Sequence, residues 1–380
     1  MRKLYPRRYD LGDATFSRSS SAYGSDDKLA TTNIPRIDRT KFGKMVWVEE
    51  GTTNLVPVAN QKFVGWYTEG YATIKLTQNQ VVHEWHCIDA TRIQTSGGTY
   101  TVKYYLPIAM PSLAGQVYTE SIYIKNIGSN PVIVATNLGQ AQTINVGESK
   151  LVKLTATGNG VSDVQINFQA RNISDALDFI AWHPMAEAKA YATSFIETSR
   201  AAESLTMPTA GLSPSEGTIE GIVEITDVVK RNADYGWIFQ LARSGSGDMR
   251  FFHGDDGNFH LQIRNDSNVM ILDVTISDDA LRNSLYYYKL YWLESNFKIE
   301  FWDVLTRDKT VEKIFVATDT PSSFVICRIG GAGSTSFANT RFGRHRLSNI
   351  ARTTDPDFNN LMPRDEYTVA LFDPTYTFLR

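Results

Sequence analysis

Two acidic residues in a tight turn are the first candidates for chemistry. Asp255 and Asp256 lie in segment 251–258, FFHGDDGN, between two apolar runs. Loop carboxylates are ligands that calcium prefers. Asp-Gly and Gly-Asn pairs are also what a hairpin loop needs, because these residues tolerate positive φ. The sequence therefore leaves a calcium site and a plain hairpin turn as alternatives and favours the turn. We expect no other cofactor.

A pair of histidines raises the question of a transition-metal site. His83 and His86 are three residues apart, in the apolar surroundings of 81–88, VVHEWHCI. Such a segment favours a strand, in which residues i and i+3 point to opposite faces. No third ligand follows at a zinc spacing. We therefore expect ordinary polar positions beside Trp85.

Two late segments carry the side chains of a sugar-binding surface. In 286–292, YYYKLYW, and 297–302, FKIEFW, alternate residues are apolar and would face a core. Rings stack on the apolar faces of sugars, and charged groups bond their hydroxyls. The glycan-binding candidates on the outward face are Tyr287, Lys289, Tyr291 and Trp302. The alternative, which we favour, is that the other domain, an N-terminal arm or a neighbouring subunit covers this face.

A second aromatic group near the start of the chain contributes two further glycan-binding candidates, Trp66 and Trp85. Aromatic residues in a β-sandwich are more often core residues than ligand platforms. We therefore favour a core or arm-contact role for both tryptophans.

The sequence contains no recognised catalytic motif. It has no GxSxG, no phosphate-binding loop, no His-rich metal motif and no β-helix repeat. Carboxylates are plentiful, but a sequence does not show two of them at the separation that glycoside cleavage needs. We expect a protein that is not an enzyme, with a glycan hydrolase as the least favoured alternative.

Composition limits the partners. The chain has 38 Lys and Arg against 41 Asp and Glu, so it lacks the positive charge that favours nucleic acid. No apolar run approaches membrane-spanning length, and no apolar signal core follows the basic start, so we expect neither membrane insertion nor secretion. Cys87 and Cys327 fall in different predicted domains, where we expect free buried thiols.

The strand pattern predicts an all-β chain of two tandem antiparallel β-sandwiches behind an extended N-terminal arm. At 380 residues, two domains are the natural expectation. Short alternating runs bounded by Gly, Pro and Asn indicate the strands. The predicted parts are an arm at 1–60, a first sandwich at 61–203, a second sandwich at 204–365 and a β-prone tail at 366–380. We expect the tail to add a strand to its own sheet or to that of a partner.

Several motifs resemble those of a family of bacteriophage tail and virion-associated proteins. The opening motifs are FSRSSSAY at 16–23, IPRID at 34–38 and WVEEGTTNL at 47–55. Two later motifs, AEAKAYATSFI at 186–196 and SRAAE at 199–203, match the pattern that closes the module. The resemblance implies a carbohydrate-binding-like jelly roll in the first sandwich. The second sandwich, which opens with SEGTI at 215–219, resembles a laminin-G or concanavalin-type domain.

The resemblance implies a virion structural protein of the tail, baseplate or fibre that helps attachment to host-surface glycan. The alternatives are a purely structural assembly or capsid decoration protein and, least favoured, the glycan-cleaving enzyme. The implied partners are other virion proteins and host-surface polysaccharide. Copies of the same chain are also implied partners, and by analogy with fibres we expect a trimer. The implied location is the virion, after assembly in the host cytoplasm. Arg18, Arg36 and Glu49-Glu50 are expected to pin the arm through charge-assisted hydrogen bonds.

Overall fold

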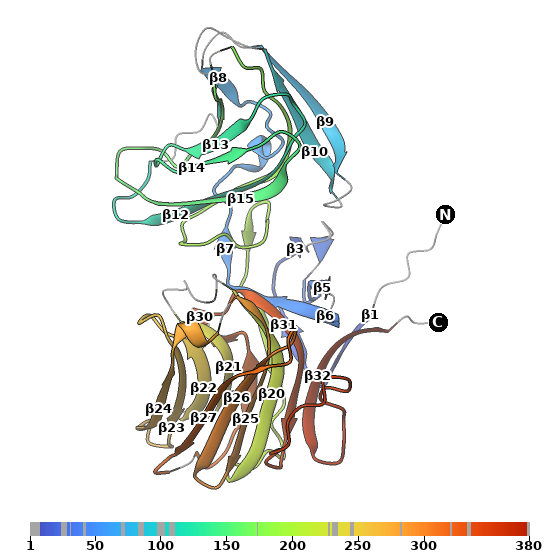
Figure 1. Ribbon diagram of the computed structural model, residues 1–380, viewed down its shortest axis with the longest axis vertical. Helices are drawn as coiled ribbons and strands as arrows, with labels where there is room; N and C mark the ends of the chain where they lie inside the picture. Colours follow the sequence, from blue (N-terminus) through green and yellow to red (C-terminus); the bar gives the residue numbers. More distant parts are fainter. Residues whose placement is uncertain are drawn as a thin grey trace. The chain divides into compact units, whose positions relative to one another are not determined.

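The computed structural model separates the chain into two compact units (Figure 1). The C-terminal unit comprises 1–21, 30–51 and 201–380, and the central unit comprises 22–29 and 52–200. Among the described residues, no helix has both the length and the apolar character needed to cross a membrane. The described residues are 8–23, 29–30, 32–40, 43–69, 73–82, 87–96, 103–105, 111–172, 174–226, 229, 235–243, 247–281, 283–319, 321–332 and 336–377.

One layer of the C-terminal unit is an antiparallel sheet that we call the β20 sheet. A short strand pair, β5 (Ile37–Thr40) with β6 (Gly43–Val48), joins it through β31. The main order is β1 (Arg8–Gly12), β32 (Thr368–Thr377), β31 (Thr340–Ser348), β20 (Glu216–Ile225), β25 (Ser284–Leu293), β26 (Asn296–Asp303) and β27 (Lys309–Val316).

The second layer is also antiparallel, and we call it the β22 sheet. Its strand Phe259–Arg264 alternates buried and half-buried residues, because one face packs on a core. The order is β2 (Thr15–Ser17), β19 (Ser204–Met207), β28 (Ile326–Ile329), β21 (Gly236–Ala242), β22 (Asp248–His253), β23 (Phe259–Arg264) and β24 (Met270–Ile276).

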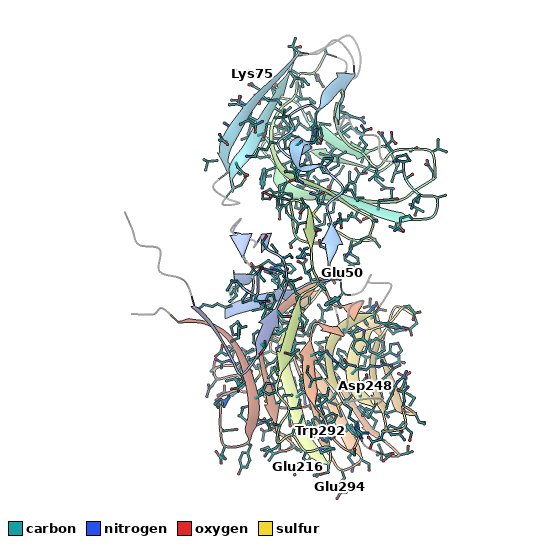
Figure 2. The ribbon with its side chains drawn as sticks, turned by 180° about the vertical axis from the view of Figure 1, so that it is seen from behind. Glu50, Lys75, Glu216, Asp248, Trp292 and Glu294 are labelled. Atoms are coloured by element: carbon teal, nitrogen blue, oxygen red, sulfur yellow. The ribbon has the colours of Figure 1, made fainter. Side chains whose placement is uncertain are left out.

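The hydrophobic core of this unit lies between the two sheets. Phe239 of the β22 sheet stacks on Tyr288 of the β20 sheet with ring centroids 5.5 Å apart, and Phe251 lies 5.2 Å from Phe301. Trp292, labelled in Figure 2, is fully buried in the same cluster. Tyr286, Tyr288, Leu290 and Trp292 all belong to this core, which confirms the facing inferred from their alternation.

Most of the N-terminal arm and the described part of the C-terminal tail belong to the C-terminal unit, whereas 22–29 and 52–60 of the arm belong to the central unit. Strand β2 pairs with β19, β6 pairs with β31, and β1 pairs with β32. Strand β32 lies between β1 and β31, so the described part of the tail extends its own sheet. These three arm strands therefore pair with strands of the second sandwich and of its tail.

The central unit contains two further antiparallel sheets around a separate core. Phe168 and Phe179 lie in that core with ring centroids 4.6 Å apart. One sheet has the order β15 (Ser149–Thr157), β12 (Val117–Asn126), β17 (Asp178–Glu187), β10 (Cys87–Thr95) and β9 (Ile74–Val82). The other has the order β14 (Ala141–Ile144), β13 (Val132–Thr136), β16 (Ile166–Ala170), β11 (Lys103–Tyr105) and β8 (Tyr67–Glu69).

The all-β prediction of antiparallel sandwiches is confirmed. The units divide the chain near 52 and 200, and the predicted sandwich bounds were 61–203 and 204–365. Cys87 and Cys327 are free and buried, each in a different unit, as expected. The remaining elements are short: β3 (Ala22–Tyr23), β4 (Leu29–Ala30), β7 (Thr52–Thr53), β18 (Ser199–Arg200), β29 (Gly331–Ala332), β30 (Ser336–Phe337) and the 3-10 turns η1 (Val58–Asn60) and η3 (Asp278–Ala280).

Candidate functional site

The charged residues of the opening motifs form a buried ionic cluster inside the C-terminal unit. Glu203 is its centre: Oε1 accepts from Arg18 Nη1 at 2.6 Å, and Oε2 accepts from Arg36 Nη2 at 2.6 Å. Glu49 contributes a carboxylate 2.6 Å from Arg36 Nη2, and its backbone N–H donates to Glu203 at 2.9 Å. The cluster holds the arm to the residue that precedes β19. The prediction that Arg18, Arg36 and Glu49 hold the arm through charge-assisted hydrogen bonds agrees with these contacts.

The four side chains of this cluster are buried and bond one another, so they are not available to a ligand. Burial acts to lower the pKa of Arg36, but Glu203 and Glu49 outweigh it and raise that pKa, so the guanidinium stays charged. Arg18 also donates to the carbonyl oxygens of Ser20, Ala30 and Ile34. Because each charge is matched by a buried partner, the motif residues serve the fold.

The predicted sugar-binding face of β25 and β26 is covered. Tyr287 and Trp302 are only 2% and 3% exposed, so neither ring can stack on a sugar. Phe358, Leu361 and Met362 pack over them in a small apolar cluster that also includes Met45 of the arm. The alternation of the strands placed these side chains on one face correctly. The exposed-platform expectation fails because a distant segment and the arm cover that face, which is the alternative that the sequence favoured.

The other two candidates on this face are also engaged. Lys289 is buried, with its Nζ 3.0 Å from Glu300 and 2.8 Å from the carbonyl oxygen of Thr354. Tyr291 is half-buried, with Lys289 above its ring. Tyr287 and Lys289 do line a hollow of about 250 Å³, but the Tyr287 hydroxyl donates to Glu220. Several of the groups that line this hollow already bond one another.

The candidates of the central unit include one core residue and one outside the described residues. Trp66 is buried beside Phe63 and Phe168, and its Nε1 donates to the carbonyl oxygen of Asn60 at 2.8 Å. It therefore has the core role that the sequence favoured. Trp85, together with His83 and His86, lies outside the described residues.

The loop with Asp255 and Asp256 is a hairpin turn between β22 and β23. The backbone N–H of Gly254 donates to the Asn258 carbonyl at 2.7 Å, and Gly257 has a φ of +80°. Asp256 accepts from Asn258 and bonds His260. The described residues hold no group of three or more His, Cys, Asp or Glu side chains suited to a metal ion. Calcium at this loop stays a prediction.

The outer face of the β22 sheet, which the sequence analysis did not single out, carries a row of aromatic side chains. Strand register aligns Trp237, Phe252 and His260 on adjacent strands β21, β22 and β23. The Trp237 and Phe252 rings stack with centroids 5.5 Å apart, and Phe252 and His260 stack at 5.4 Å. A β-bulge between Trp237 and Phe239 turns both Ile238 and Phe239 toward the core while Trp237 stays on the outer face.

A row of amide and charged side chains runs beside the aromatic row. Register places Arg328, Gln240, Arg250, Gln262 and Asp273 opposite one another across β28, β21, β22, β23 and β24. Gln240 Oε1 accepts from Arg328 at 2.8 Å, and Gln262 Oε1 accepts from Arg250 at 2.7 Å and 3.0 Å. On β22 and β23 the two rows are two residues apart, or about 6.8 Å along the strand.

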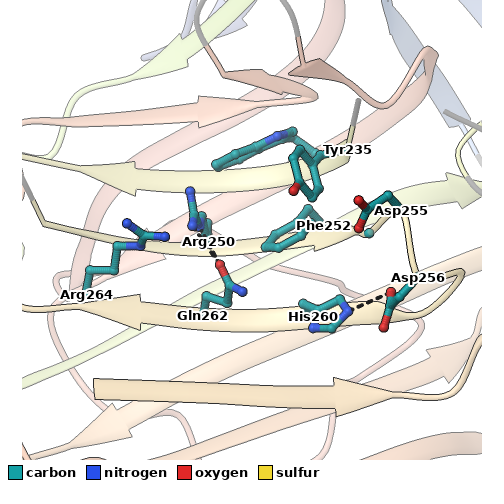
Figure 3. A pocket seen from close by; sticks show the side chains of 10 residues that line it. Tyr235, Arg250, Phe252, Asp255, Asp256, His260, Gln262 and Arg264 are labelled. Atoms are coloured by element: carbon teal, nitrogen blue, oxygen red, sulfur yellow. Dashed lines mark hydrogen bonds and ion pairs between the residues drawn. The ribbon is translucent and has the colours of Figure 1, made fainter. Parts of the chain in front are cut away.

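The two rows meet in a pocket of about 490 Å³ (Figure 3). Trp237 and Phe252 form its largely buried floor, 6% and 3% exposed, whereas Tyr235 at its edge is 40% exposed and meets Phe252 edge-on. Tyr235 has a φ of +88°, a conformation that bulky residues rarely adopt and that is often found at functional sites. The pocket therefore offers one accessible ring and convergent polar groups.

His260 joins the acidic end of the pocket to the aromatic row. Its Nε2 lies 2.9 Å from Asp256 and its Nδ1 lies 3.1 Å from Asp273. Burial acts to lower the pKa of His260, but bonds to the two carboxylates outweigh it and raise the pKa. The same contact with His260 lowers the pKa of Asp256 to about 2. As an imidazolium, His260 donates to both carboxylates and holds the hairpin against β24.

A signal for this pocket does exist in the sequence. In 259–264, FHLQIR, the apolar residues alternate with His260, Gln262 and Arg264, which puts three ligand-capable side chains on one face. The aromatic partners come from strands that pair only in the folded sheet. The pattern of one strand therefore predicts the polar side chains of the pocket. The aromatic side chains can be placed beside them only when the pairing of the strands is known.

No protein-family model and no curated protein matches this chain. Solved structures with some likeness include tailspike protein 2 of the Escherichia coli O157:H7 bacteriophage CAB120, with 10% identity, a TM-score of 0.32 and coverage of 40% of this chain and 23% of the tailspike. Another is the enzymatically active domain of bacteriophage CBA120 tailspike protein 2, with 9% identity, a TM-score of 0.35 and coverage of 71% and 34%. The tandem CBM22 domain of Paenibacillus barcinonensis Xyn10C has 12% identity, a TM-score of 0.25 and coverage of 77% and 96%.

These likenesses carry no functional conclusion for this chain, since each TM-score is below 0.5. The chain also spans only about a quarter to a third of the tailspike chains that it matches.

Proposed function

We propose that this chain is a bacteriophage virion component that binds host-surface glycan, without cleaving it, through the pocket on the β22 sheet. The observation that supports binding is the pocket itself: exposed Tyr235 stands at the edge of a hollow lined by Arg250, Gln262 and His260. A ring that stacks on the sugar and polar groups that bond its hydroxyls are the usual elements of such sites.

The virion assignment rests on the opening and closing motifs, which resemble those of phage tail and virion-associated proteins. Its support is that Arg18, Arg36, Glu49 and Glu203, all motif residues, meet in one buried cluster. Residues that act together in the fold are the ones a shared architecture would retain. The chain would assemble with other virion proteins and with copies of itself; its place in the tail, baseplate or fibre is tested by imaging virions that carry a labelled chain.

A glycan array with the purified chain tests the binding proposal, and calorimetry on each hit gives the affinity. Tyr235→Ala should weaken saturable binding about tenfold or more, because the accessible ring is lost. Tyr367→Ala is the matched control, since Tyr367 is similarly exposed and lies outside the pocket. Saturable binding that Tyr235→Ala leaves unchanged would contradict the site.

The same experiment addresses the two alternatives. If no glycan binds, the purely structural assembly or decoration role replaces the attachment role. Incubation with each bound polysaccharide, followed by an assay for new reducing ends, tests the proposed absence of cleavage. Sustained release of reducing ends by the purified chain would overturn that part of the proposal.

A further inference from the structure

Two arginines that line the β22 pocket bond amide oxygens, as Arg328 of the same sheet also does through Gln240. Arg250 donates only to the amide oxygen of Gln262, and Arg264 donates to that of Asn268 at 3.2 Å. Within the described part of the chain, neither forms a hydrogen bond to a carboxylate. Many other arginines of the unit contact carboxylates directly: Arg18, Arg36, Arg243, Arg341, Arg344, Arg346, Arg352 and Arg364.

The positive charge of Arg250 is therefore only partly compensated. Its side chain is 18% exposed, and the nearest carboxylate, Asp248, is 3.7 Å from Nη1. That carboxylate oxygen already accepts from Gln240 Nε2 at 2.8 Å. Burial lowers the pKa of Arg250 and the nearby Arg264 lowers it further, while Asp248 acts the other way. A guanidinium in this state gains from an incoming anion, because little solvation remains to be lost.

Arg264 adds an independent observation. Its Nε is buried and has no hydrogen-bond partner among the described residues, although the side chain lines the pocket. Buried guanidinium donors are normally satisfied, and an orphaned one at a pocket wall points to a ligand acceptor. The two arginines together can present several N–H donors to one anionic group.

The pocket is also polarised along its length. Figure 3 shows Arg264 and Arg250 toward one end and Asp255 and Asp256 toward the other, beyond Phe252. Asp256 bonds His260, which also bonds Asp273. An anionic substituent would be repelled near Asp255 and attracted at the arginine end. A sugar that reaches from Tyr235 toward that end thus has a defined orientation.

We infer that the glycan bound in this pocket is anionic, with its carboxylate or phosphate group held by Arg250 and Arg264. This inference rests on the proposed glycan-binding function and narrows its ligand class. The Gln262 and His260 side chains already bond Arg250, Asp256 and Asp273, so the two arginines are the charged donors of the pocket that lack a direct carboxylate bond among the described residues. A pair of arginines without carboxylate bonds, one with an orphaned Nε, is what an anionic sugar requires.

The test uses the array hits from the purified full chain. Each bound polysaccharide is retested after chemical reduction of its carboxylates to alcohols, and separately after removal of its phosphate groups. One of the two treatments should reduce affinity roughly tenfold or more, which identifies the source of the charge. Arg250→Gln and Arg264→Gln should each produce a similar loss, and raised salt should weaken binding by the wild-type chain.

Arg171→Gln is the matched control, because Arg171 is an exposed arginine of the central unit. Thermal unfolding of each variant separates lost binding from lost folding. Saturable binding that survives both chemical treatments and both arginine substitutions would overturn the anionic-ligand inference and leave the glycan-binding function intact. A complete absence of glycan binding by the folded wild-type chain would overturn both.

Discussion

Arginines serve two opposite roles within the C-terminal unit. In the arm cluster, Arg18 and Arg36 are buried against Glu203 and Glu49, with ion-pair distances of 2.6 Å. On the β22 sheet, Arg250 and Arg264 meet only neutral amide oxygens directly. Arginine thus forms structural ion pairs in the arm cluster, whereas on the β22 sheet it is a cation without a direct bond to a carboxylate of the described residues.

The difference separates residues that hold the fold from residues available to a ligand. A buried charge that loses its partner is strongly destabilising, so the arm cluster should tolerate little change. A half-buried cation bonded to an amide contributes less to the stability of the fold than a buried ion pair does. It can contribute more to the free energy of binding an anionic ligand. The contrast yields four expectations about stability and binding, each of which can be measured.

The largest effect is expected from Glu203→Gln, which removes the central carboxylate of the arm cluster. Arg18 and Arg36 would lose the carboxylate that they share, with Glu49 still beside Arg36, and the free energy of unfolding should fall by about 3–5 kcal/mol. Urea denaturation of the purified chain measures this loss. Glu312→Gln is the control, since that carboxylate is 42% exposed on β27 and should matter little. An equal loss of stability from the two substitutions would contradict the role of the buried cluster in holding the arm to the sandwich.

A second expectation concerns a carboxyl group that is buried and forms no ion pair with any described residue. Glu120 lies on β12 of the central unit, where burial raises its pKa to about 8, partly offset by a bond from the Gln165 backbone. The native chain then holds a proton that the unfolded chain releases, so stability should fall as pH rises from about 4.5 to about 8.

Glu120→Gln should remove this dependence and stabilise the central unit at pH 8.5 by at least about 1 kcal/mol. Unfolding curves at pH 5 and pH 8.5 measure the difference between wild type and variant. Glu148→Gln is the control, because Lys150 and other partners lower the pKa of that more exposed carboxyl. A gain from Glu120→Gln that is the same at both pH values would contradict a buried neutral carboxyl.

Arg250→Gln is the counterpart of the Glu203 substitution on the β22 sheet. It removes a cation that lies 5.1 Å from the Trp237 ring and 5.5 Å from the Phe252 ring, so a stability loss of about 1 kcal/mol is expected. Binding of an anionic glycan should weaken roughly tenfold or more. Calorimetry and thermal unfolding give the two quantities on one sample. A stability loss as large as that of Glu203→Gln would abolish the contrast between the regions.

The smallest effect is expected from His260. Because its two carboxylate partners raise its pKa above the unfolded value of about 6.5, its contribution is fully present below that pH and is lost as pH rises through the folded pKa. The melting temperature of wild type should therefore exceed that of His260→Gln by more at pH 5.5 than at pH 8.5. A difference that grows with pH would show that the imidazole is not held as the cation.

Much of the fold could be predicted from alternation along single strands. The pattern in 286–292 identified which tyrosines face the core, and β25 has that arrangement. The hairpin at Asp255–Asp256 was favoured for its turn residues and is present. The charged motif residues were expected to pin the arm, and Arg18 and Arg36 do so. The first two features depend on local chemistry. The third follows because charged side chains are buried only when an opposite charge pairs with them.

The candidate site was less predictable, because a site depends on which faces remain accessible. Tyr287 and Trp302 have the composition of a sugar platform, yet Phe358, Leu361 and Met362 cover them. Those covering residues are more than 50 positions away in the chain, and no period in β25 or β26 reveals them. Tyr235, by contrast, is exposed beside a floor made of Trp237 and Phe252 from two adjacent strands.

The sequence by itself determined the strand faces, the all-β class and the identity of the arm residues that must be paired. These follow from the two-residue period of a strand and from the high cost of burying an unpaired charge. Only the tertiary structure decided which aromatic face is covered and that the arginines of the β22 pocket bond amide oxygens and not carboxylates. The physical reason is that cover and counter-charge come from segments distant in sequence, brought into place by sheet register and by packing of the arm.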